Sequence, residues 1–251
     1  MKRLCSLTSF RSRTLYRHNH DFSTGRTGVF LGSPFNSLRT LSALPLKTTH
    51  TYTSNTCRRG IAIMPLERSH DPLVWIDCEM TGLDPQKDEI LQICCFITDS
   101  NLNLLDPHGF EAVIHHPQST LAAMSQWCID THGRTGLTAS VLASMTTPEE
   151  ASRELLAYIQ KYVPEPRRAL LAGNSVHADK AFLAREPYAR VLEWLHYRIL
   201  DVSSFKEGAR RWGGAGLLED VPGKKLVHLA RDDILESIEE MRFYRDRLFG
   251  K

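Results

Sequence analysis

The sequence lacks long hydrophobic runs and any closely spaced pair of cysteines that could form a metal motif. Charged or turn-forming residues interrupt every apolar stretch of the 251 residues well before the roughly 18 residues that a membrane-spanning helix needs. The six cysteines show no C-x-x-C spacing, and the neighbours Cys94 and Cys95 are poorly placed to bond to each other. We therefore predict no membrane span, no structural zinc site and a reducing compartment.

Acidic residues are almost missing from residues 1–66, which carry ten lysines and arginines against one acid, Asp21. Because the whole chain has a net charge of +2, residues 67–251 are net acidic and do not form a general nucleic-acid-binding surface. A basic, acid-poor segment rich in serine and threonine is typical of a mitochondrial transit peptide. The alternative is a disordered basic tail. We predict mitochondrial localisation, whereas an internal start at Met64 would give a form without the tail in the cytoplasm or nucleus.

Residues 67–251 have the pattern of one α/β domain without internal repeats. Short apolar runs predict strands over residues 73–76, 89–98, 110–114, 170–173 and 197–202, the first three as an antiparallel meander. Helical periodicity predicts helices over residues 119–132, from Thr147-Pro148 onward, 179–194, 203–212 and 230–249. We expect Trp212 to end its helix against the sheet, and Leu248 to be buried under the last helix.

The first predicted strand ends in Asp77-Cys78-Glu79. Residues i and i+2 of a strand face the same side, so both carboxylates project together beside a hydrophobic run. Two like charges there repel each other unless a cation lies between them, and oxygen ligands of this kind suit magnesium or manganese. For a lone D-x-E motif, however, solvated acids at an exposed strand end are the commoner explanation.

Further acids and two histidines occur later in the chain. Asp179 stands where a strand meets a helix, although it could simply complement the helix dipole there. His228 and Asp233 stand around the start of the last predicted helix. Four carboxylates and a histidine suit phosphodiester cleavage, in which acids bind metals and a histidine takes a proton from water. His177, two residues before Asp179, is a second candidate for the base.

These motifs together resemble the oligoribonuclease family of 3′-to-5′ exoribonucleases, which belongs to the four-acid exonuclease superfamily with a histidine base. The matching segments are Asp77-x-Glu79-Met80-Thr81-Gly82-Leu83, Gly173-Asn174-Ser175 with Asp179, His196-Tyr197-Arg198, and His228 with Asp233. They occur in the family's order and spacing between Pro72 and Phe249. The resemblance implies an RNase H-like exonuclease fold with a mixed β-sheet flanked by helices, a homodimer and a fungal-type mitochondrial form.

The resemblance also implies a role for each matching residue. Two divalent cations, Mg²⁺ or Mn²⁺, would be bound by Asp77, Glu79, Asp179 and Asp233, and the general base would be His228. The two bases and the 3′ end of the substrate would be held by Leu83, Trp127 and His132. The 5′ phosphate would be capped by Ser175, Arg198 and Ser203, while the neighbouring protomer's site would be reached by Tyr197.

We therefore expect an enzyme that hydrolyses dinucleotides and very short RNA oligomers to mononucleotides, with RNA rather than DNA as its main substrate. A proofreading-type DNA exonuclease is one alternative, but it would share the four acids without the W-x4-H motif and the cap. A catalytically silent module that binds short RNA or dimerises is another, and the intact acids argue against it. The sequence departs from the family at Gln92, Cys94-Cys95 and Arg231, none of which is a predicted catalytic residue.

Overall fold

The computed structural model describes residues 69–214, 216–223 and 229–250. The predicted tail, residues 1–66, and the predicted base, His228, lie outside these ranges. Among the described residues, no helix combines the length and the apolar character needed to cross a membrane.

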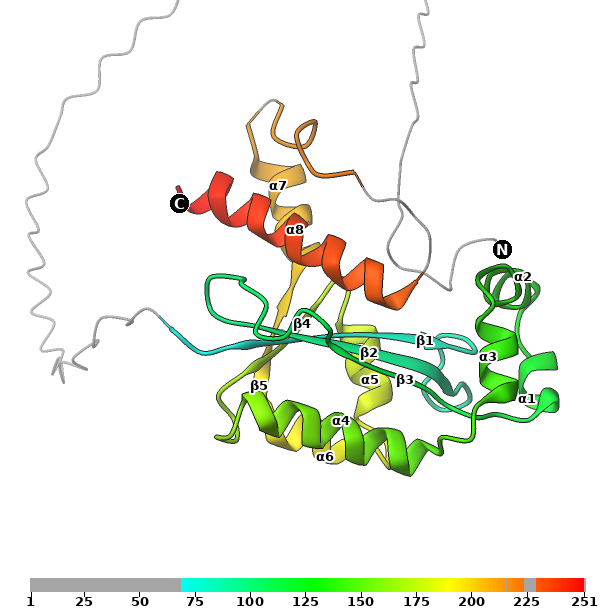
Figure 1. The fold of residues 1–251 in the computed structure, drawn as a ribbon. Helices are drawn as coiled ribbons and strands as arrows, with labels where there is room; N and C mark the ends of the chain where they lie inside the picture. The colour runs from blue at the N-terminus through cyan, green and yellow to red at the C-terminus, as the bar shows by residue number, and fades with distance from the viewer. Residues whose placement is uncertain (1–68, 215, 224–228, 251) are drawn as a thin grey trace, which may run out of the picture. The chain divides into compact units, whose positions relative to one another are not determined.

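A mixed β-sheet organises the described part of the chain (Figure 1). Its strands are β1 (Leu73–Met80), β2 (Ile90–Thr98), β3 (Phe110–Val113), β4 (Leu170–Gly173) and β5 (His196–Asp201), in the order β3-β2-β1-β4-β5. The predicted antiparallel meander of β1, β2 and β3 is confirmed, and β4 and β5 continue the sheet parallel to β1. The carboxyl ends of β1, β4 and β5 therefore meet at one edge of the sheet.

Helices α7 (Val202–Trp212) and α8 (Ala230–Phe249) cover one face of this sheet (Figure 1). The buried cluster on this face includes Trp75, Phe96, Ile234 and Tyr244. The indole Nε1 of Trp75 also donates a hydrogen bond to Thr98 Oγ1 at 3.0 Å, so its polar atom is satisfied inside the core. Because side chains alternate along a strand, the face that carries Trp75 continues to Asp77 and then to Glu79.

Three helices cover the opposite face, namely α4 (Pro148–Tyr162), α5 (His177–Leu183) and α6 (Ala189–Trp194) (Figure 1). Buried aliphatic side chains of α4, among them Leu155 and Ile159, belong to the apolar cluster on this face, and α4 contacts β2 and β3 there. The predicted start of α4 is confirmed, since Thr147 and Glu150 form a complete capping box with Pro148 at the first helical position. Helices α1 (Gln118–Ala122), α2 (Gln126–Thr135) and α3 (Leu137–Ala143) form a third apolar cluster with Leu91 of β2.

Three arginines of α8 attach this helix to the loop between β2 and β3. They donate hydrogen bonds to backbone carbonyls: Arg231 to Pro107 and His108, Arg242 to Leu102, and Arg245 to Asn101. The guanidinium of Arg231 also lies 4.9 Å from the centre of the Phe96 ring, a cation–π contact. Arg231 therefore holds the first turn of α8 against the β2–β3 loop and against β2.

Two predicted helices are each divided in the structure. The helix predicted over residues 119–132 is two helices, and a new one begins after Ser125, whose side chain accepts a hydrogen bond from the Cys128 backbone N–H. The helix predicted over residues 179–194 is α5 and α6, separated by a segment with Pro187, which has no backbone donor to continue a helix. The helix α3 was not predicted.

The expected burial of Trp212 and Leu248 is wrong, because their side chains are 83% and 40% exposed. Both stand near the ends of helices that continue past the core. The last buried cluster members on α7 and α8 are Ala209 and Tyr244. The final turn of each helix therefore extends beyond the buried cluster.

Candidate active site

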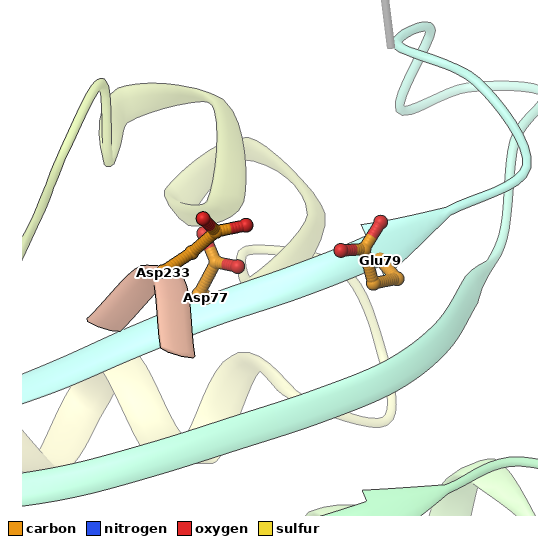
Figure 2. Close-up of side chains that lie close together, drawn as sticks. All are labelled: Asp77, Glu79 and Asp233. Atoms are coloured by element: carbon orange, nitrogen blue, oxygen red, sulfur yellow. The ribbon is translucent and has the colours of Figure 1, made fainter. Parts of the chain in front are cut away.

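Three carboxylates gather where β1 meets the start of α8. Asp77 and Glu79 project from one face of β1, and Asp233 comes from the first turn of α8 (Figure 2). One oxygen from each of the three lies within 4.8 Å of the others. The carboxylates of Asp77 and Asp233 face each other across the gap between strand and helix (Figure 2). We call Asp77, Glu79 and Asp233 the acidic triad.

The packing of α8 explains why the triad forms. Ile234 and Ile238 are 3% and 1% exposed on the sheet, and Asp233 next to Ile234 is brought to the same side. Asp233 is itself only 8% exposed. It belongs to the first helical turn, where the positive end of the helix dipole favours a carboxylate.

Asp179, the fourth predicted metal ligand, lies beside the triad but is turned toward the backbone of β1. It stands in the first turn of α5, is 6% exposed, and accepts a hydrogen bond from the Cys78 backbone N–H at 2.9 Å. In the described part of the chain, the triad that could hold one ion does not include it. The negative charge of Asp179 nevertheless helps to raise the pKa of Glu79.

Burial and mutual repulsion change the acidity of these groups. Burial, together with the charges of Asp233 and Asp179, raises the pKa of Glu79 to about 8. Burial is also the main cause that raises the pKa of Asp179 to about 7, and the hydrogen bond from Cys78 opposes this rise. The site thus holds more negative charge than it can stabilise alone. Clustered carboxylate oxygens are ligands that Mg²⁺ or Mn²⁺ prefers, so the residues present fit a divalent cation.

The loop after β1 is folded around another carboxylate, that of Asp88, which is not part of the acidic triad. Asp88 accepts hydrogen bonds from the Thr81 hydroxyl and from the Asp84 backbone N–H, both at 2.9 Å. A Cβ atom at Gly82 would lie 2.3 Å from the Asp88 carboxylate, which explains why glycine stands there. This loop holds Leu83 directly after the strand that carries Asp77 and Glu79.

The two predicted base-binding residues of α2 have different surroundings. Trp127 is 36% exposed, as a residue that stacks on a base would need to be. His132 is 2% exposed, and its Nε2 lies 3.1 Å from the Met80 carbonyl oxygen. Its Nδ1 lies 3.9 Å from Glu79 Oε2. The structure therefore places His132 against β1 and the acidic triad rather than on an open surface.

Two of the residues predicted to cap a 5′ phosphate, Ser175 and Ser203, lie at the carboxyl ends of β4 and β5, whereas Arg198 is the third residue of β5 and lies level with the start of β4. Ser175 follows β4 and has a φ of 58°, and Ser203 stands in the first turn of α7. Tyr197 and Arg198 are exposed on β5, at the edge of the sheet, with the guanidinium of Arg198 5.3 Å from the centre of the Tyr197 ring. The alternative base, His177, is not part of the triad, and its Nδ1 lies 3.5 Å from Asp201 Oδ2.

Two residues near the site were missed in the sequence. Asp201 accepts hydrogen bonds from both predicted cap segments, and its position before Val202-Ser203 is a helix N-cap pattern that could have identified it. The sequence around Asp88 contains no comparable pattern, because its hydrogen bonds with Thr81 and Asp84 form only when the whole loop is folded.

Comparison with known proteins identifies the family. Residues 74–241 match the exonuclease family model. The mitochondrial oligoribonuclease of Saccharomyces cerevisiae is 49% identical over 181 residues, which cover 70% of this chain and 66% of the yeast protein. The chain belongs to the oligoribonuclease family of exonucleases. The human mitochondrial oligoribonuclease is 44% identical over 192 residues, covering 76% of this chain and 79% of the human one. The oligoribonuclease of Marinobacter nauticus is 46% identical over 180 residues, covering 71% and 97% respectively.

Solved structures support the fold assignment. Escherichia coli exonuclease I in complex with a dT13 oligonucleotide has a TM-score of 0.54 and 16% identity, covering 72% of this chain and 43% of that one. Cell-death related nuclease 4 has a TM-score of 0.53 and 14% identity, covering 72% and 65% respectively. At these identities the likeness concerns the fold alone. The predicted oligoribonuclease family and RNase H-like exonuclease fold are both confirmed.

The raised pKa of Glu79 predicts how the stability of the metal-free protein depends on pH. A carboxyl that moves from 4.5 to about 8 on folding binds its proton more tightly when folded, so stability falls as pH rises through this range. Glu79→Gln removes this effect. At about pH 8, without metal, we expect the variant to be more stable than the parent by at least about 1 kcal/mol, or roughly 2–4 °C in Tm.

Thermal unfolding in chelator at about pH 5 and about pH 8 measures this difference, which should grow with pH. Magnesium at about pH 8 should raise the Tm of the parent more than that of the variant. Glu154→Gln, an exposed acid on α4, is the control and should show neither effect. A Glu79→Gln variant that loses stability relative to the parent as pH rises would contradict the analysis.

Proposed function

We propose that this chain is a 3′-to-5′ exoribonuclease that hydrolyses dinucleotides and very short RNA oligomers to mononucleotides. The observation that carries the proposal is the acidic triad, formed by the carboxyl end of β1 and the first turn of α8 in a chain of the oligoribonuclease family. Five catalytic groups, Asp77, Glu79, Asp179, Asp233 and His228, are all present in the sequence. A silent binding module would have no chemical reason to keep repelling acids together.

We propose that Asp77, Glu79 and Asp233, with Asp179 beside them, hold two divalent cations, Mg²⁺ or Mn²⁺. The triad supplies clustered oxygen ligands, and the high pKa of Glu79 is what a carboxylate cluster shows without its cation. Bound cations would neutralise the acids and stabilise the charge that develops on the phosphate. The loop of Thr81 and Gly82 keeps the end of β1 in place for this role.

The remaining residues act on the water and the substrate. His228, just before α8, would accept the proton of the attacking water. Trp127 and Leu83 would hold the bases and the 3′ end. His132 would hold the 3′ end together with them, and it is buried against Met80 and Glu79.

A cap on the 5′ phosphate would select short substrates. Arg198 can make two charge-assisted hydrogen bonds to one phosphate, and Ser175 and Ser203 would add hydroxyl groups. The exposed Tyr197 on an edge strand would reach the site of a second protomer in a homodimer. A substrate of two to a few nucleotides needs no long basic groove, which fits the net acidic charge of residues 67–251.

For the full chain we propose two parts, a mitochondrial transit peptide over residues 1–66 and an exonuclease domain over residues 67–251. The family match begins at residue 74, after the basic tail. The yeast, bovine and human relatives are each named as mitochondrial oligoribonucleases.

A comparison of four substrates tests the proposed activity. A 5′-phosphorylated RNA dinucleotide should be hydrolysed fastest, ahead of a five-residue RNA, a long RNA and a DNA oligomer, and only with magnesium or manganese. Asp233→Asn removes one metal-binding charge and should reduce turnover by about 10³-fold or more while leaving the unfolding transition intact. Preference for DNA would favour a proofreading exonuclease, and binding without hydrolysis would favour a silent module.

Substitution of the two candidate histidines tests the assignment of the base. His228→Ala should lower kcat by roughly 10² to 10⁴ with little change in KM, because a general base acts only in the transition state. His177→Ala should leave kcat within a few-fold of the parent. The reverse pattern in single-turnover rates would move the base to His177.

Arg198→Ala tests the selection of length by the cap. The loss of one charged hydrogen-bonding group should cost on the order of 1.5–3 kcal/mol in kcat/KM on a 5′-phosphorylated dinucleotide. Long RNA, whose 5′ end lies elsewhere, should be affected much less. An equal proportional loss on both substrates would indicate a general exonuclease without a cap.

A further inference from the structure

Asp201 lies between the two segments that carry the serines of the proposed cap. It is the last residue of β5 and the N-cap of α7, and it pairs in register with Gly173 at the end of β4. Its side chain is only 9% exposed. A carboxylate this close to a proposed phosphate site would by charge alone weaken phosphate binding. Its presence there requires another explanation.

One oxygen of Asp201 accepts three hydrogen bonds. Its Oδ1 receives the backbone N–H of Ser175 at 2.8 Å, the backbone N–H of Ser203 at 2.9 Å and the hydroxyl of Ser203 at 2.6 Å. Its Oδ2 faces His177 Nδ1 at 3.5 Å. A single side chain therefore links the turn after β4 to the first turn of α7.

The backbone of Ser175 needs such support. Its φ of 58° lies in the left-handed region, which residues other than glycine seldom adopt and which must be held by the surroundings. Ser175 is 8% exposed, so water has little access to replace the hydrogen bond of its N–H. Loss of the Asp201 acceptor would leave this buried donor unpaired and allow the turn to relax.

We propose that Asp201 is a positioning residue that holds Ser175 and Ser203 in the arrangement in which they receive the 5′ phosphate, an inference that rests on the proposed cap. The backbone N–H bonds of Ser175 and Ser203 to Asp201 fix both residues, and on binding a phosphate the Ser203 hydroxyl would turn its proton from Asp201 to a phosphate oxygen. Asp201 itself does not touch the substrate. It contributes to selection of short RNA by keeping both serines at the carboxyl ends of β4 and β5.

Asp201→Ala tests this role, with a pair of RNA dinucleotides that differ only in a 5′ phosphate or a 5′ hydroxyl. We expect kcat/KM to fall about 10- to 100-fold on the phosphorylated dinucleotide, by analogy with the loss of a partner that orients a metal ligand. The loss on the 5′-hydroxyl dinucleotide should stay within about threefold. Asp201→Asn keeps an acceptor oxygen and should recover a large part of the loss.

Thr147→Ala is the matched control, because it removes the N-cap of α4 on the opposite face of the sheet. It should lower Tm as the loss of a cap does, without changing the ratio of rates on the two dinucleotides. A ratio unchanged by Asp201→Ala would overturn the proposal, as would an Asp201→Asn variant no better than the alanine one. If Asp201→Ala failed to fold, the ratio measured for Asp201→Asn and Ser203→Ala would decide.

Arg198→Ala separates failure of this proposal from failure of the cap. If Arg198→Ala lowers the rate on the phosphorylated dinucleotide selectively and Asp201→Ala does not, the cap stands and Asp201 has no positioning role. If neither variant distinguishes the two dinucleotides, the cap is wrong and the role of Asp201 falls with it.

Discussion

Repulsion among clustered carboxylates is the constraint on which the rest of this structure depends. Asp77 and Asp233 are held together on two different elements, so their repulsion would separate α8 from the sheet unless other contacts opposed it. Those contacts are the apolar face of α8, where each fully buried Ile or Met contributes about 1.5–3 kcal/mol, and the arginines that bind the β2–β3 loop. Without a cation, protonation of a carboxylate reduces the remaining repulsion, and the raised pKa of Glu79 is consistent with this.

The site also depends on contacts between the two helices of its own face. Lys206 of α7 lies 3.4 Å from Glu240 of α8, and Glu240 is 1% exposed and accepts a hydrogen bond from Tyr244. A buried carboxylate is tolerated only when it is paired and hydrogen-bonded in this way. Because Ser203 stands in the first turn of α7 and Asp233 in the first turn of α8, this pair links the proposed phosphate cap to the acidic triad. A shift of one helix would therefore be transmitted to the other part of the site.

Features set by residues close together in the sequence could be predicted, whereas contacts between residues far apart in the sequence could not. The alternation of β1 predicted that Asp77 and Glu79 share a face, and the capping box predicted the start of α4. The burial of His132 depends on Met80, more than fifty residues away in sequence, and the arginine contacts of α8 span still longer separations. Such contacts leave no periodic signal in the chain. The divided helices were missed because single residues, Ser125 and Pro187, outweighed an otherwise helical pattern.

The arrangement of strands gives a physical reason for a short substrate. Strand β4 separates β1, which carries the acids, from β5, which ends at Asp201. Neighbouring strands lie about 4.8 Å apart, so β1 and β5 are roughly 10 Å apart across the sheet. That interval is short on the scale of a nucleic-acid strand. Since hydrogen-bonded strands hold it constant, a cap at β5 would favour an RNA whose 5′ end lies one or two nucleotides from the cleaved bond. The selection of length would then come from the order of strands in the sheet rather than from a long binding groove.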